Sequence, residues 1–568
     1  MNPAQLFSHF DRISEAPDAI PRLRQFILEL AVRGKLVDRD ASETPASELL
    51  KSCRAEADRR VASGTMQKLA RIRTVQPDEA WFEIPSNWLW VRLATIAQVI
   101  MGHSPPGHTY NKTGDGVPLI NGPVEFTNGP FGKTVINQYT TAPKNICEVE
   151  DLLLCVRGST TGRTNIAGFR ACIGRGVAAI RPFLDAQYIH LFIWRLRASI
   201  IGMGRGIAFP SVSRQQVEEL PVPLPPLAEQ HRIVAKVDEL MALCDRLQTA
   251  QRERESRRDW LAAASLHRLN QPVDGDPIAF REHSRFHLRH LPRLTTRPEQ
   301  IKQLRQTILN LALRGRLVQQ NSDDEPASEL LKRIQAEKER LIKKGTLRKE
   351  KPLPQVARDG APFSVPTSWS WARIGTCSLL TEYGTSVKSD HSENGVPVLK
   401  MGDIQGGRLV LGGQKKVPRL IDDLPQLFLK RFDLLYNRTN SAELVGKTGI
   451  YLGEDDAYTF ASYLIRIRFI IGLTSPIYSN LAMNAPYFRK TQILPELQQQ
   501  CGQANVNGTK LRNMVIPLPP LAEQHRIVAK VDELMVICDQ IEAQLTTTQM
   551  DSRRLLEAVL HEALAPAT

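Results

Sequence analysis

The sequence predicts a mixed α+β protein with an internal pseudo-twofold duplication, in which two globular α/β domains are separated by long paired antiparallel helices. The nineteen residues PLPPLAEQHRIVAKVDELM at positions 223–241 recur without a change at positions 517–535. The segment LRQFILELAVRGKLV from Leu23 matches LRQTILNLALRGRLV from Leu304 at 11 of 15 positions. Because solenoid repeats span only roughly 20 to 50 residues, this much longer period predicts two large equivalent lobes.

The length of 568 residues indicates several domains, because one hydrophobic core rarely grows beyond roughly 250 to 300 residues. No run approaches the roughly 20 apolar residues of a membrane span, and the first residues lack the pattern of a signal peptide. We therefore expect a cytoplasmic protein. The eight cysteines are scattered without a CxxC pair, which argues against a zinc site and against a disulfide framework.

The formal net charge of +14 favours a polyanionic partner, since basic surfaces attract phosphates through counterion release. Many soluble proteins are also basic. Composition alone therefore leaves nucleic-acid binding as one of two interpretations.

Each copy of the repeated block leads into a long predicted helix. Proline is tolerated in the first turn of a helix but cannot continue one, so the helices are expected to begin near Leu227 and near Leu521. A helix from residue 227 toward residue 269 is about 60 Å long at 1.5 Å per residue. Apolar residues at heptad spacing predict that each long helix packs antiparallel on its duplicate. The seam residues are Ile233, Val237, Leu240, Cys244 and Leu247, then Ile527, Val531, Leu534, Cys538, Ile541 and Leu545.

Shorter helices precede each globular domain. They are predicted at residues 23–37, 46–61, 304–318 and 327–344, and Gly34 and Gly315 are expected to end or bend the first helix of each pair. The Pro- and Arg-rich stretch at 269–300 is interpreted as the linker between the two copies.

The intervals between the helical regions carry short apolar runs punctuated by Gly, Pro and Asn, such as DLLLCVRGSTTGRTN from Asp151. These runs predict strands and turns, and the glycine cluster GMGRG from Gly202 is interpreted as a turn. The predicted domains are an N-terminal helical region (1–80), a first globular domain (81–220), a central helical region with a linker near 270–300 (221–361), a second globular domain (362–515) and a C-terminal helix (516–568).

We find neither a catalytic nor a metal site in the sequence. The Pro-Pro pairs are followed by Gly or Leu, not by the aromatic residue of an amino-methyltransferase loop. The triplet Gly446-Lys447-Thr448 resembles the end of a phosphate-binding loop, but Ser441 occupies the position of the required first glycine. His283, His287 and His290 could hold a metal on a helix, yet no Cys or carboxylate motif accompanies them, so a solvated basic linker is the favoured interpretation.

Polar and basic side chains in glycine-rich turns are the candidates for DNA contact. Glycine permits close approach of the backbone, and the neighbouring side chains supply donors for phosphates and base edges. The alternative for each position is an ordinary polar surface turn. The candidates are His103, Ser104, Tyr110, Arg157, Ser159, Thr160, Thr161 and Arg163 in the first domain, and Thr385, Ser386, Lys388, Arg438, Asn440, Ser441 and Lys447 in the second.

The order of these motifs resembles the specificity subunit of Type I restriction-modification enzymes. IPSNWLWVRL from Ile84 precedes a GVPLI strand, a DLLLCVRGSTTGR turn and PLPPLAEQ at the start of a heptad helix, and the series occurs twice. The resemblance implies two target recognition domains, each reading one half of a split DNA sequence, held apart by paired conserved helices. Because a duplex repeats about every 34 to 36 Å, such readers would contact half-sites about one turn apart.

The same resemblance implies the partners. The duplicated helical regions would dock two methyltransferase subunits and, through them, the restriction subunit. No cofactor is expected in this chain, whereas S-adenosylmethionine, ATP and Mg²⁺ are expected on the partner subunits, and this subunit is expected to be non-catalytic. The partner-docking candidates are Glu229, Gln230, Arg232, Lys236, Glu523, Gln524, Arg526 and Lys530.

Two other functions stay open at the level of sequence. One is a fused enzyme that modifies nucleic acid itself, which S-adenosylmethionine binding by this chain would favour. The other is a coiled-coil DNA-binding scaffold, or a specificity component of another adenine methylation or phage-defence system. A scaffold would bind DNA without sequence preference.

Overall fold

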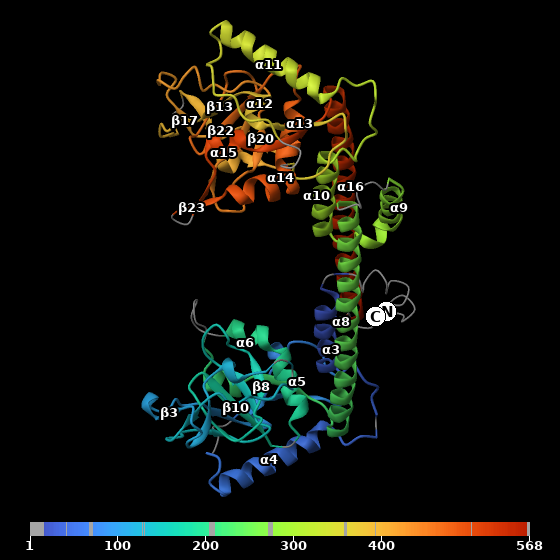
Figure 1. Cartoon of the computed structure of the whole chain (residues 1–568). Helices are drawn as coiled ribbons and strands as arrows, with labels where there is room; N and C mark the ends of the chain where they lie inside the picture. The colour runs from blue at the N-terminus through green and yellow to red at the C-terminus, as the bar shows by residue number, and fades with distance from the viewer. Residues whose placement is uncertain are drawn as a thin grey trace. The chain divides into compact units, whose positions relative to one another are not determined.

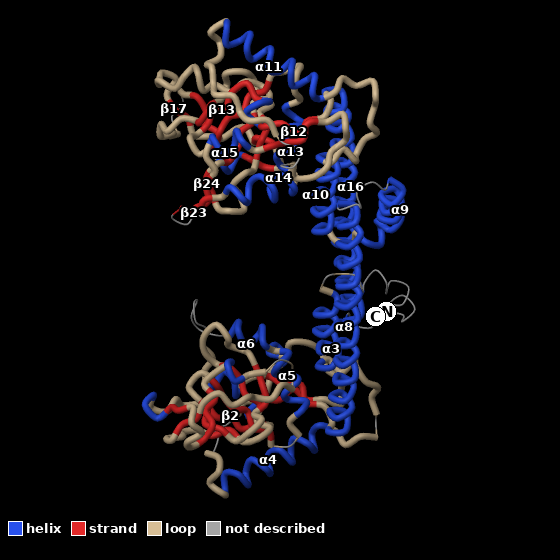
Figure 2. Tube along the Cα trace, viewed as in Figure 1, coloured by secondary structure: helices blue, strands red, loops and turns tan. Residues whose placement is uncertain are grey.

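The computed structural model describes residues 16, 18–40, 42–67, 72–127, 129, 131–183, 185–203, 211–270, 277–356, 361–391, 394–500 and 503–564. The chain forms two compact units. Unit 1 comprises Met1–Arg254 with Gln549–Thr568, and unit 2 comprises Glu255–Thr548. In each unit the strands gather in a globular region and helices lie around it, which confirms the predicted mixture of helices and strands (Figures 1 and 2).

The described residues of unit 1 form three small sheets. The strand orders are β2-β10-β7-β8, β3-β5-β4-β9-β6 and β1-β11. The pairings are antiparallel except between β4 and β9. The strands are β1 (Leu89–Arg92), β2 (Ala97–Met101), β3 (Tyr110–Asn111), β4 (Val117–Ile120), β5 (Tyr139–Thr140), β6 (Ile146–Cys147), β7 (Leu152–Cys155), β8 (Thr164–Ile166), β9 (Ala171–Ile173), β10 (Val177–Pro182) and β11 (Pro221–Leu224). The helices are α3 (Ala19–Val32), α4 (Ala46–Ala62), α5 (Gln187–Arg195), α6 (Arg197–Met203), α7 (Arg214–Glu218) and the first part of α8 (Leu227–Asn270).

Unit 2 repeats this plan with additional strands. The strand orders are β13-β22-β18-β20-β16-β15, β17-β14-β21, β19-β24-β23 and β12-β25. The strands are β12 (Ser370–Arg373), β13 (Ser378–Tyr383), β14 (Val396–Leu399), β15 (Ile404–Gln405), β16 (Arg408–Leu409), β17 (Lys416–Val417), β18 (Leu434–Asn437), β19 (Thr439–Asn440), β20 (Thr448–Ile450), β21 (Thr459–Phe460), β22 (Leu464–Phe469), β23 (Gln498–Gln500), β24 (Gln503–Asn505) and β25 (Val515–Leu518). The helices are α9 (Pro277–Leu294), α10 (Pro298–Leu313), α11 (Ala327–Lys343), α12 (Ile374–Cys377), α13 (Pro476–Asn484), α14 (Pro486–Phe488), α15 (Gly508–Asn513) and the first part of α16 (Leu521–Leu564).

The start of each repeated block closes its globular region. Trp90 pairs with Pro223 across β1 and β11, and Trp371 pairs with Pro517 across β12 and β25. The chain then leaves the sheet and enters α8 or α16, which begin at Leu227 and Leu521 as predicted.

The helix-ending glycines are also confirmed. Gly34 and Gly315 both have a φ of 65°, a left-handed conformation that glycine adopts without a Cβ penalty. The predicted helix at residues 23–37 therefore stops at Val32 and the one at 304–318 stops at Leu313.

Each unit is completed by the end of the long helix that begins in the other. In unit 1, Ala16 and Ala19 of the N-terminal region pack with Leu556 and Val559 of α16. In unit 2, Asn270 at the end of α8 donates from Nδ2 to Thr307 Oγ1 over 3.0 Å. The first part of the α8 seam packs inside unit 1, where Ile233, Val237 and Cys244 belong to the main core with side chains of α3, α4 and α5.

Part of the stretch at residues 269–300, which is interpreted as the linker between the two copies, is helical. Residues 277–294 form α9, because Pro277 at the first position is compatible with a helix, and His287 of α9 is hydrogen-bonded to Ser265 of α8. His287 is 3% exposed instead of solvated. Among the described residues no group of His, Cys, Asp or Glu could hold a metal ion.

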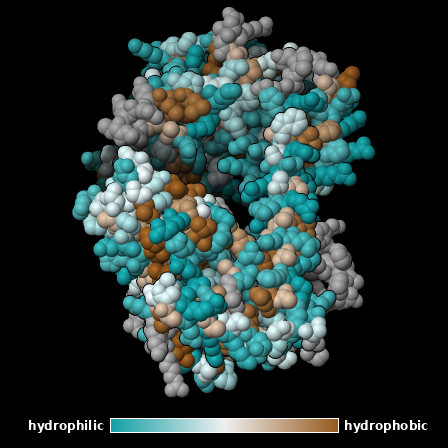
Figure 3. Space-filling model, turned by 90° about the horizontal axis from the view of Figure 1, so that it is seen from below, coloured by the Kyte–Doolittle hydropathy of each residue, from teal (hydrophilic) through white to brown (hydrophobic). Residues whose placement is uncertain are grey.

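Three further properties of the chain concern its helices, its surface and its cysteines. None of the helices in the described part of the chain is both long and apolar enough to cross a membrane. Hydrophilic residues cover most of the face drawn in Figure 3, and hydrophobic residues lie among them. The cysteines that the structure describes are free and buried.

Candidate nucleic-acid interface

Three loops of unit 1 lie side by side and are joined by hydrogen bonds. The Arg175 amide donates to Ser104 Oγ over 3.1 Å, which joins the β9–β10 connection to the loop after β2. The Val156 amide donates to the Gly176 carbonyl over 2.9 Å, which joins the same connection to the turn between β7 and β8. We call these loops the unit 1 loop cluster, which comprises residues 102–106, 156–163 and 174–176.

Unit 2 contains the same arrangement. The Ser462 amide donates to the Thr385 carbonyl over 2.8 Å, and the Arg438 amide donates to the Tyr463 carbonyl over 3.1 Å. These bonds join the loop after β13, the β21–β22 connection and the turn after β18. We call them the unit 2 loop cluster, which comprises residues 384–388, 437–447 and 461–463.

Glycine opens the first loop of both clusters for the same steric reason. A Cβ on Gly102 would lie 2.1 Å from the Gly174 carbonyl oxygen, and a Cβ on Gly384 would lie 2.2 Å from the Phe460 carbonyl oxygen. Such contacts with backbone atoms cannot be relieved by moving a side chain. The loop that begins with this glycine is GHSPP in unit 1 and GTSVK in unit 2. The glycine is therefore shared by the two units, whereas the side chains that follow it differ.

Most of the predicted contact residues reach the surface of these clusters. The exposed ones are His103, Arg157, Ser159, Ser386, Lys388, Ser441 and Lys447, and the partly exposed ones are Ser104, Tyr110, Thr160, Arg163, Arg438 and Asn440. The structure thus brings together residues that lie more than fifty positions apart in each domain.

Two of the predicted contacts need correction. Thr161 is 1% exposed, and its hydroxyl donates to the Gly158 carbonyl over 2.8 Å. Thr385 is 3% exposed, and its hydroxyl donates to Asp423 Oδ2 over 2.6 Å. Both side chains support the backbone of their loops from inside and do not face a ligand.

Partly exposed candidates are braced by their own loops. Tyr110 donates from its hydroxyl to the Pro105 carbonyl over 3.2 Å, and Arg163 donates from Nη2 to the Phe126 carbonyl over 3.3 Å. These bonds hold the side chains in place before any ligand arrives.

Arg438 is the most constrained cation of the unit 2 loop cluster. Its guanidinium lies 4.9 Å from the centre of the Tyr383 ring, and Nη1 donates to the Ser462 carbonyl over 3.3 Å. The Tyr383 hydroxyl in turn accepts a hydrogen bond from the Gly508 amide over 2.6 Å. An arginine stacked on a fixed ring is suited to planar recognition of phosphates or base edges.

The sequence analysis missed three exposed residues of these surfaces. Arg175 is exposed between Gly174 and Gly176, while Tyr463 is 51% exposed and Tyr383 is 45% exposed. The Gly-Arg-Gly triplet between two apolar runs was the available signal for Arg175. The tyrosines follow ordinary strand patterns and carry no comparable signal.

In each unit a partly buried Asp–Arg ion pair lies at the opposite end of the strands that lead to the cluster. Arg181 of β10 donates from Nη2 to Asp151 Oδ2 over 2.7 Å, and Arg468 of β22 donates from Nη2 to Asp433 Oδ2 over 2.5 Å. Burial by itself lowers the pKa of both guanidinium groups, but the hydrogen bonds to the aspartates outweigh it and the pKa is raised. Both arginines therefore stay charged and hold the strand that leads to each cluster.

Unit 2 extends its cluster with the β23–β24 hairpin. Thr439 of β19 pairs with Asn505 of β24, and the Val506 amide donates to the Arg438 carbonyl over 2.9 Å. In unit 1, Arg157 is bridged to Ser211 at the corresponding place. The glycine cluster from Gly202 lies mostly outside the described residues, so its interpretation as a turn stays a prediction.

Comparison with known proteins identifies the family. The profile of the Type I restriction modification DNA specificity domain matches residues 85–255 and 380–548, which together make up more than half of the chain. The Type I restriction enzyme EcoEI specificity subunit of Escherichia coli is 30% identical over 96% of this chain and 94% of its own length. This chain belongs to the family of Type I restriction enzyme specificity subunits.

A second relative agrees with this assignment, and one solved structure is similar over part of the chain. The EcoAI specificity subunit of Escherichia coli is 29% identical over 96% of this chain and 94% of its own length. The crystal structure of the HsdS subunit from Thermoanaerobacter tengcongensis is 30% identical and covers 36% of this chain and 47% of that chain, with a TM-score of 0.28. In this specificity subunit the two profile matches contain the two loop clusters.

The repeated block of the specificity subunit was predicted to dock partners, and four of its residues need correction. Glu229 and Glu523 are 0% exposed. Trp88 donates from Nε1 to Glu229 Oε2 over 3.0 Å, and Trp369 donates from Nε1 to Glu523 Oε2 over 2.9 Å. Burial raises the pKa of the Glu523 carboxyl, although its hydrogen bonds lower it in part. These glutamates fix the long helices to their own units.

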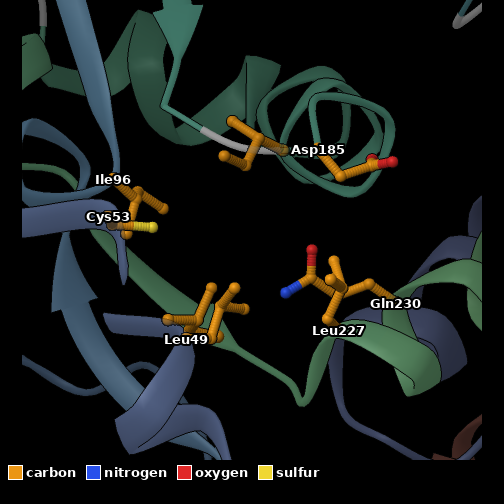
Figure 4. Close-up of a pocket in the computed structure, with 8 residues that line it drawn as sticks. Leu49, Cys53, Ile96, Asp185, Leu227 and Gln230 are labelled. Atoms are coloured by element: carbon orange, nitrogen blue, oxygen red, sulfur yellow. The ribbon is translucent and has the colours of Figure 1, made fainter. Parts of the chain in front are cut away.

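The neighbouring glutamines are buried as well. Gln230 donates from Nε2 to the Pro225 carbonyl over 2.9 Å, and Gln524 donates to the Pro519 carbonyl over 2.9 Å. Figure 4 shows Gln230 and Leu227 facing Leu49 and Cys53 of α4 across a small cavity of about 10 Å³. That volume holds at most one water molecule, so Gln230 and Gln524 close the fold and do not present a docking surface.

The basic residues of the block do reach the surface. The side chains of Arg232 and Arg526 are 38% and 37% exposed and pair with Glu43 and Asp324 of their own units. Lys236 and Lys530 are 41% and 40% exposed, and each pairs with a glutamate three residues further along the same helix. The lysines are therefore the better candidates for an outward docking face, and that role stays a prediction.

Proposed function

We propose that this specificity subunit is the non-catalytic DNA-reading component of a Type I restriction-modification complex, and that each unit reads one half of a bipartite, asymmetric target. One observation carries the proposal: the loop cluster occurs once in each unit with the same backbone connections and with different exposed side chains. Because the backbone of the two loop clusters is alike, both units can approach DNA in the same way. Because their exposed side chains differ, the two half-sites that they recognise would differ in sequence.

The two long helices would set the distance between the half-sites. α8 and α16 contain 44 residues each, which corresponds to about 66 Å at 1.5 Å per residue. Each begins in one unit and ends in the other. We propose that they lie antiparallel as a pair, so that the gap between half-sites is constant.

The partners follow from the same proposal. Two methyltransferase subunits dock on the duplicated helical regions, with Lys236 and Lys530 on the docking face, and the restriction subunit joins through them. S-adenosylmethionine, ATP and Mg²⁺ belong to those subunits. The complex works in the cytoplasm on double-stranded DNA.

The decisive experiment exchanges one reader. Residues 81–220 are replaced by the corresponding segment of another specificity subunit, and N6-methyladenine is mapped across the genome of cells that also carry the methyltransferase subunit. One half of the methylated motif should change, while the other half and the gap stay constant. Cells that lack only this chain are the control, and they should lose the motif.

Other outcomes would contradict the proposal. A change in both halves would refute two independent readers. A methylation map that does not depend on this chain, while the methyltransferase is active, would favour a scaffold. Stoichiometric S-adenosylmethionine binding by the isolated chain would favour a fused enzyme.

A further inference from the structure

A groove in unit 2 lies apart from the loop clusters. It runs between α9 and residues 255–270 of α8 and encloses about 270 Å³. Its lining residues are Trp260, Leu261, Ala264, Ser265, Arg268, Glu282, His283 and Phe286. This volume can admit several side-chain atoms, unlike the 10 Å³ cavity beside Gln230.

Large apolar side chains at the groove are open to solvent. Trp260 is 71% exposed, Phe286 is 44% exposed and Leu261 is 42% exposed. Phe286 is held against His290, with ring centres 4.7 Å apart. Exposed apolar clusters of this kind mark interaction sites in soluble proteins, because leaving them in water costs free energy.

The groove is preformed by polar contacts between its walls and floor. Ser265 Oγ and His287 Nδ1 lie 2.9 Å apart in a buried hydrogen bond that joins α8 to α9. Burial lowers the pKa of His287, so this imidazole is uncharged at neutral pH. Arg297 and Gln300 bond to Asp259 and fix the next segment of chain to the same stretch of α8. A partner therefore meets a rigid surface and loses little free energy in ordering it.

Basic residues lie beside the groove, and its lining contains both Arg268 and Glu282. Arg281, Arg285, Arg289 and Arg293 repeat every four residues along α9 and are exposed, and Glu282 is the one acidic residue of that helix. The helical period places Arg289 and Arg293 beside the groove-lining Phe286, away from the face that carries the buried His287. Within the described part of the chain, none of the four forms an ion pair with a carboxylate.

We propose that this groove binds an acidic amphipathic helix of a second protein, whose apolar side chains cover Trp260 and Phe286 and whose carboxylates meet the arginines of α9. An apolar floor beside a row of arginines matches the two faces of such a helix. Duplex DNA would satisfy the arginines, but its phosphates would leave the aromatic floor exposed. The inference does not depend on the DNA-reading function, because the groove shares no residue with either loop cluster.

The test uses the full chain and a defined probe. The probe is a fluorescein-labelled 18-residue helical peptide with leucines at i, i+3, i+4 and i+7 and glutamates on the opposite face. Anisotropy should show saturable binding that weakens with salt. Trp260→Ala and Phe286→Ala should each lower affinity about tenfold or more, and the double variant Arg289→Glu/Arg293→Glu should do the same.

Matched controls separate the groove from general surface effects. Leu420→Ala removes an apolar side chain that is 98% exposed elsewhere in unit 2 and should leave peptide affinity unchanged. Peptides with glutamine for glutamate, or serine for leucine, should lose affinity. Circular dichroism spectra equal to wild type show that the variants remain folded.

Three results would overturn the inference. The first is absence of saturable peptide binding, or binding that survives both aromatic substitutions. The second is binding of a non-specific DNA duplex in place of the peptide, where the duplex affinity is lost in Arg289→Glu/Arg293→Glu and retained in Trp260→Ala. The third is self-association of the chain that Trp260→Ala abolishes, because a second copy would then occupy the groove.

Discussion

The same two strands pair in both units with different chemistry between them. In unit 1, Ile100 of β2 faces Ala179 of β10, and both belong to an apolar cluster. In unit 2, Glu382 of β13 faces Arg466 of β22 at the equivalent position and forms an ion pair with it. Arg466 is 1% exposed and also donates from Nη1 to the Phe428 carbonyl over 2.7 Å.

The comparison shows which constraints the duplicated fold retains. The two units share the order of the first four strands in the main sheet and the Asp–Arg pair at one end of those strands. The neighbouring cross-strand pair has exchanged an apolar contact for a charged one. A backbone frame held by hydrogen bonds tolerates such an exchange as long as every buried charge keeps a partner. The two readers can therefore diverge inside as well as on their surfaces.

Breaking the buried pair should have the largest effect. Burial lowers the pKa of the Arg466 guanidinium, and the adjacent Arg468 lowers it further, so this charge depends on its carboxylate partners. Arg466→Ala leaves Glu382 without its cation and should cost unit 2 about 3 kcal/mol, the lower end for a broken buried pair. Urea unfolding of the full chain, followed by hydrogen exchange in β13 and β22, measures the loss.

The apolar pair Ile100–Ala179 of unit 1 provides the control for this prediction. The double variant Arg466→Ala/Glu382→Ile installs the apolar pair of unit 1 and should recover most of the lost stability. If the double variant is as unstable as Arg466→Ala, the charged pair does not replace an apolar contact in the way that the comparison indicates.

The second largest difference should be in the acid stability of the two units. His190 of α5 is 1% exposed, and burial lowers its pKa to about 4, although Glu150 and Asp185 raise it slightly. The unfolded imidazole takes up its proton near pH 6.5, so stability is full above that pH and falls as the pH drops toward 4, by about 3 kcal/mol in total. The equivalent position in α13 is Asn480, which does not titrate.

Hydrogen exchange of α5 peptides between pH 7 and pH 4.5, corrected for the intrinsic exchange rate, should reveal this loss in unit 1. His190→Leu removes the titrating group and should abolish the pH dependence in α5. An equal dependence in the variant would assign the effect to another group.

The hydrogen bonds from Trp88 to Glu229 and from Trp369 to Glu523 should differ less in their contribution to stability. Trp88→Phe and Trp369→Phe each remove one hydrogen bond from a buried glutamate. Glu523 keeps Gln320, which donates to Oε1 over 2.6 Å, whereas Glu229 Oε1 has no partner among the described residues and Oε2 keeps Asn87 at 3.3 Å. We expect a cost of about 2 kcal/mol in unit 1 and about 1 kcal/mol in unit 2.

Denaturant unfolding with local hydrogen exchange at the starts of α8 and α16 compares the two hydrogen bonds. Trp81→Phe changes a tryptophan that is 40% exposed and is the matched control. A larger loss for Trp369→Phe would contradict the ranking.

The loop clusters should give the smallest and most local effects. Arg175→Ala and Tyr463→Ala remove exposed side chains and should leave stability unchanged. Each should weaken discrimination at one half-site by about 1 kcal/mol, which corresponds to several-fold in binding. Competition binding with duplexes mutated in one half-site at a time measures it, and an effect at both half-sites would argue against separate readers.

The features that sequence predicted correctly are local ones. The prolines before Leu227 and Leu521 and the left-handed Gly34 and Gly315 act within a few residues, so the ends of the helices could be predicted. The helix at residues 277–294 was not predicted because proline and arginine suggested a linker, although proline at the first position suits a helix.

The site was harder to predict because distant contacts decide which polar side chains are free. Thr385 looks like a surface donor until the fold brings Asp423 against its hydroxyl. Glu229 at the start of a helix looks solvated until Trp88 covers it. Arg175 was missed because its neighbours in space, and not in sequence, place it beside Ser104.

The exchange of helix ends between the units has a consequence for synthesis. α3 in unit 1 packs on Leu556 and Val559, and Arg22 meets Glu557 over 2.8 Å. These partners are translated after every residue of unit 2, which ends at Thr548. The half of the protein that is translated first is therefore the half that finishes folding last, and a nascent chain halted before residue 549 carries one complete reader and one whose N-terminal helix still lacks its partner.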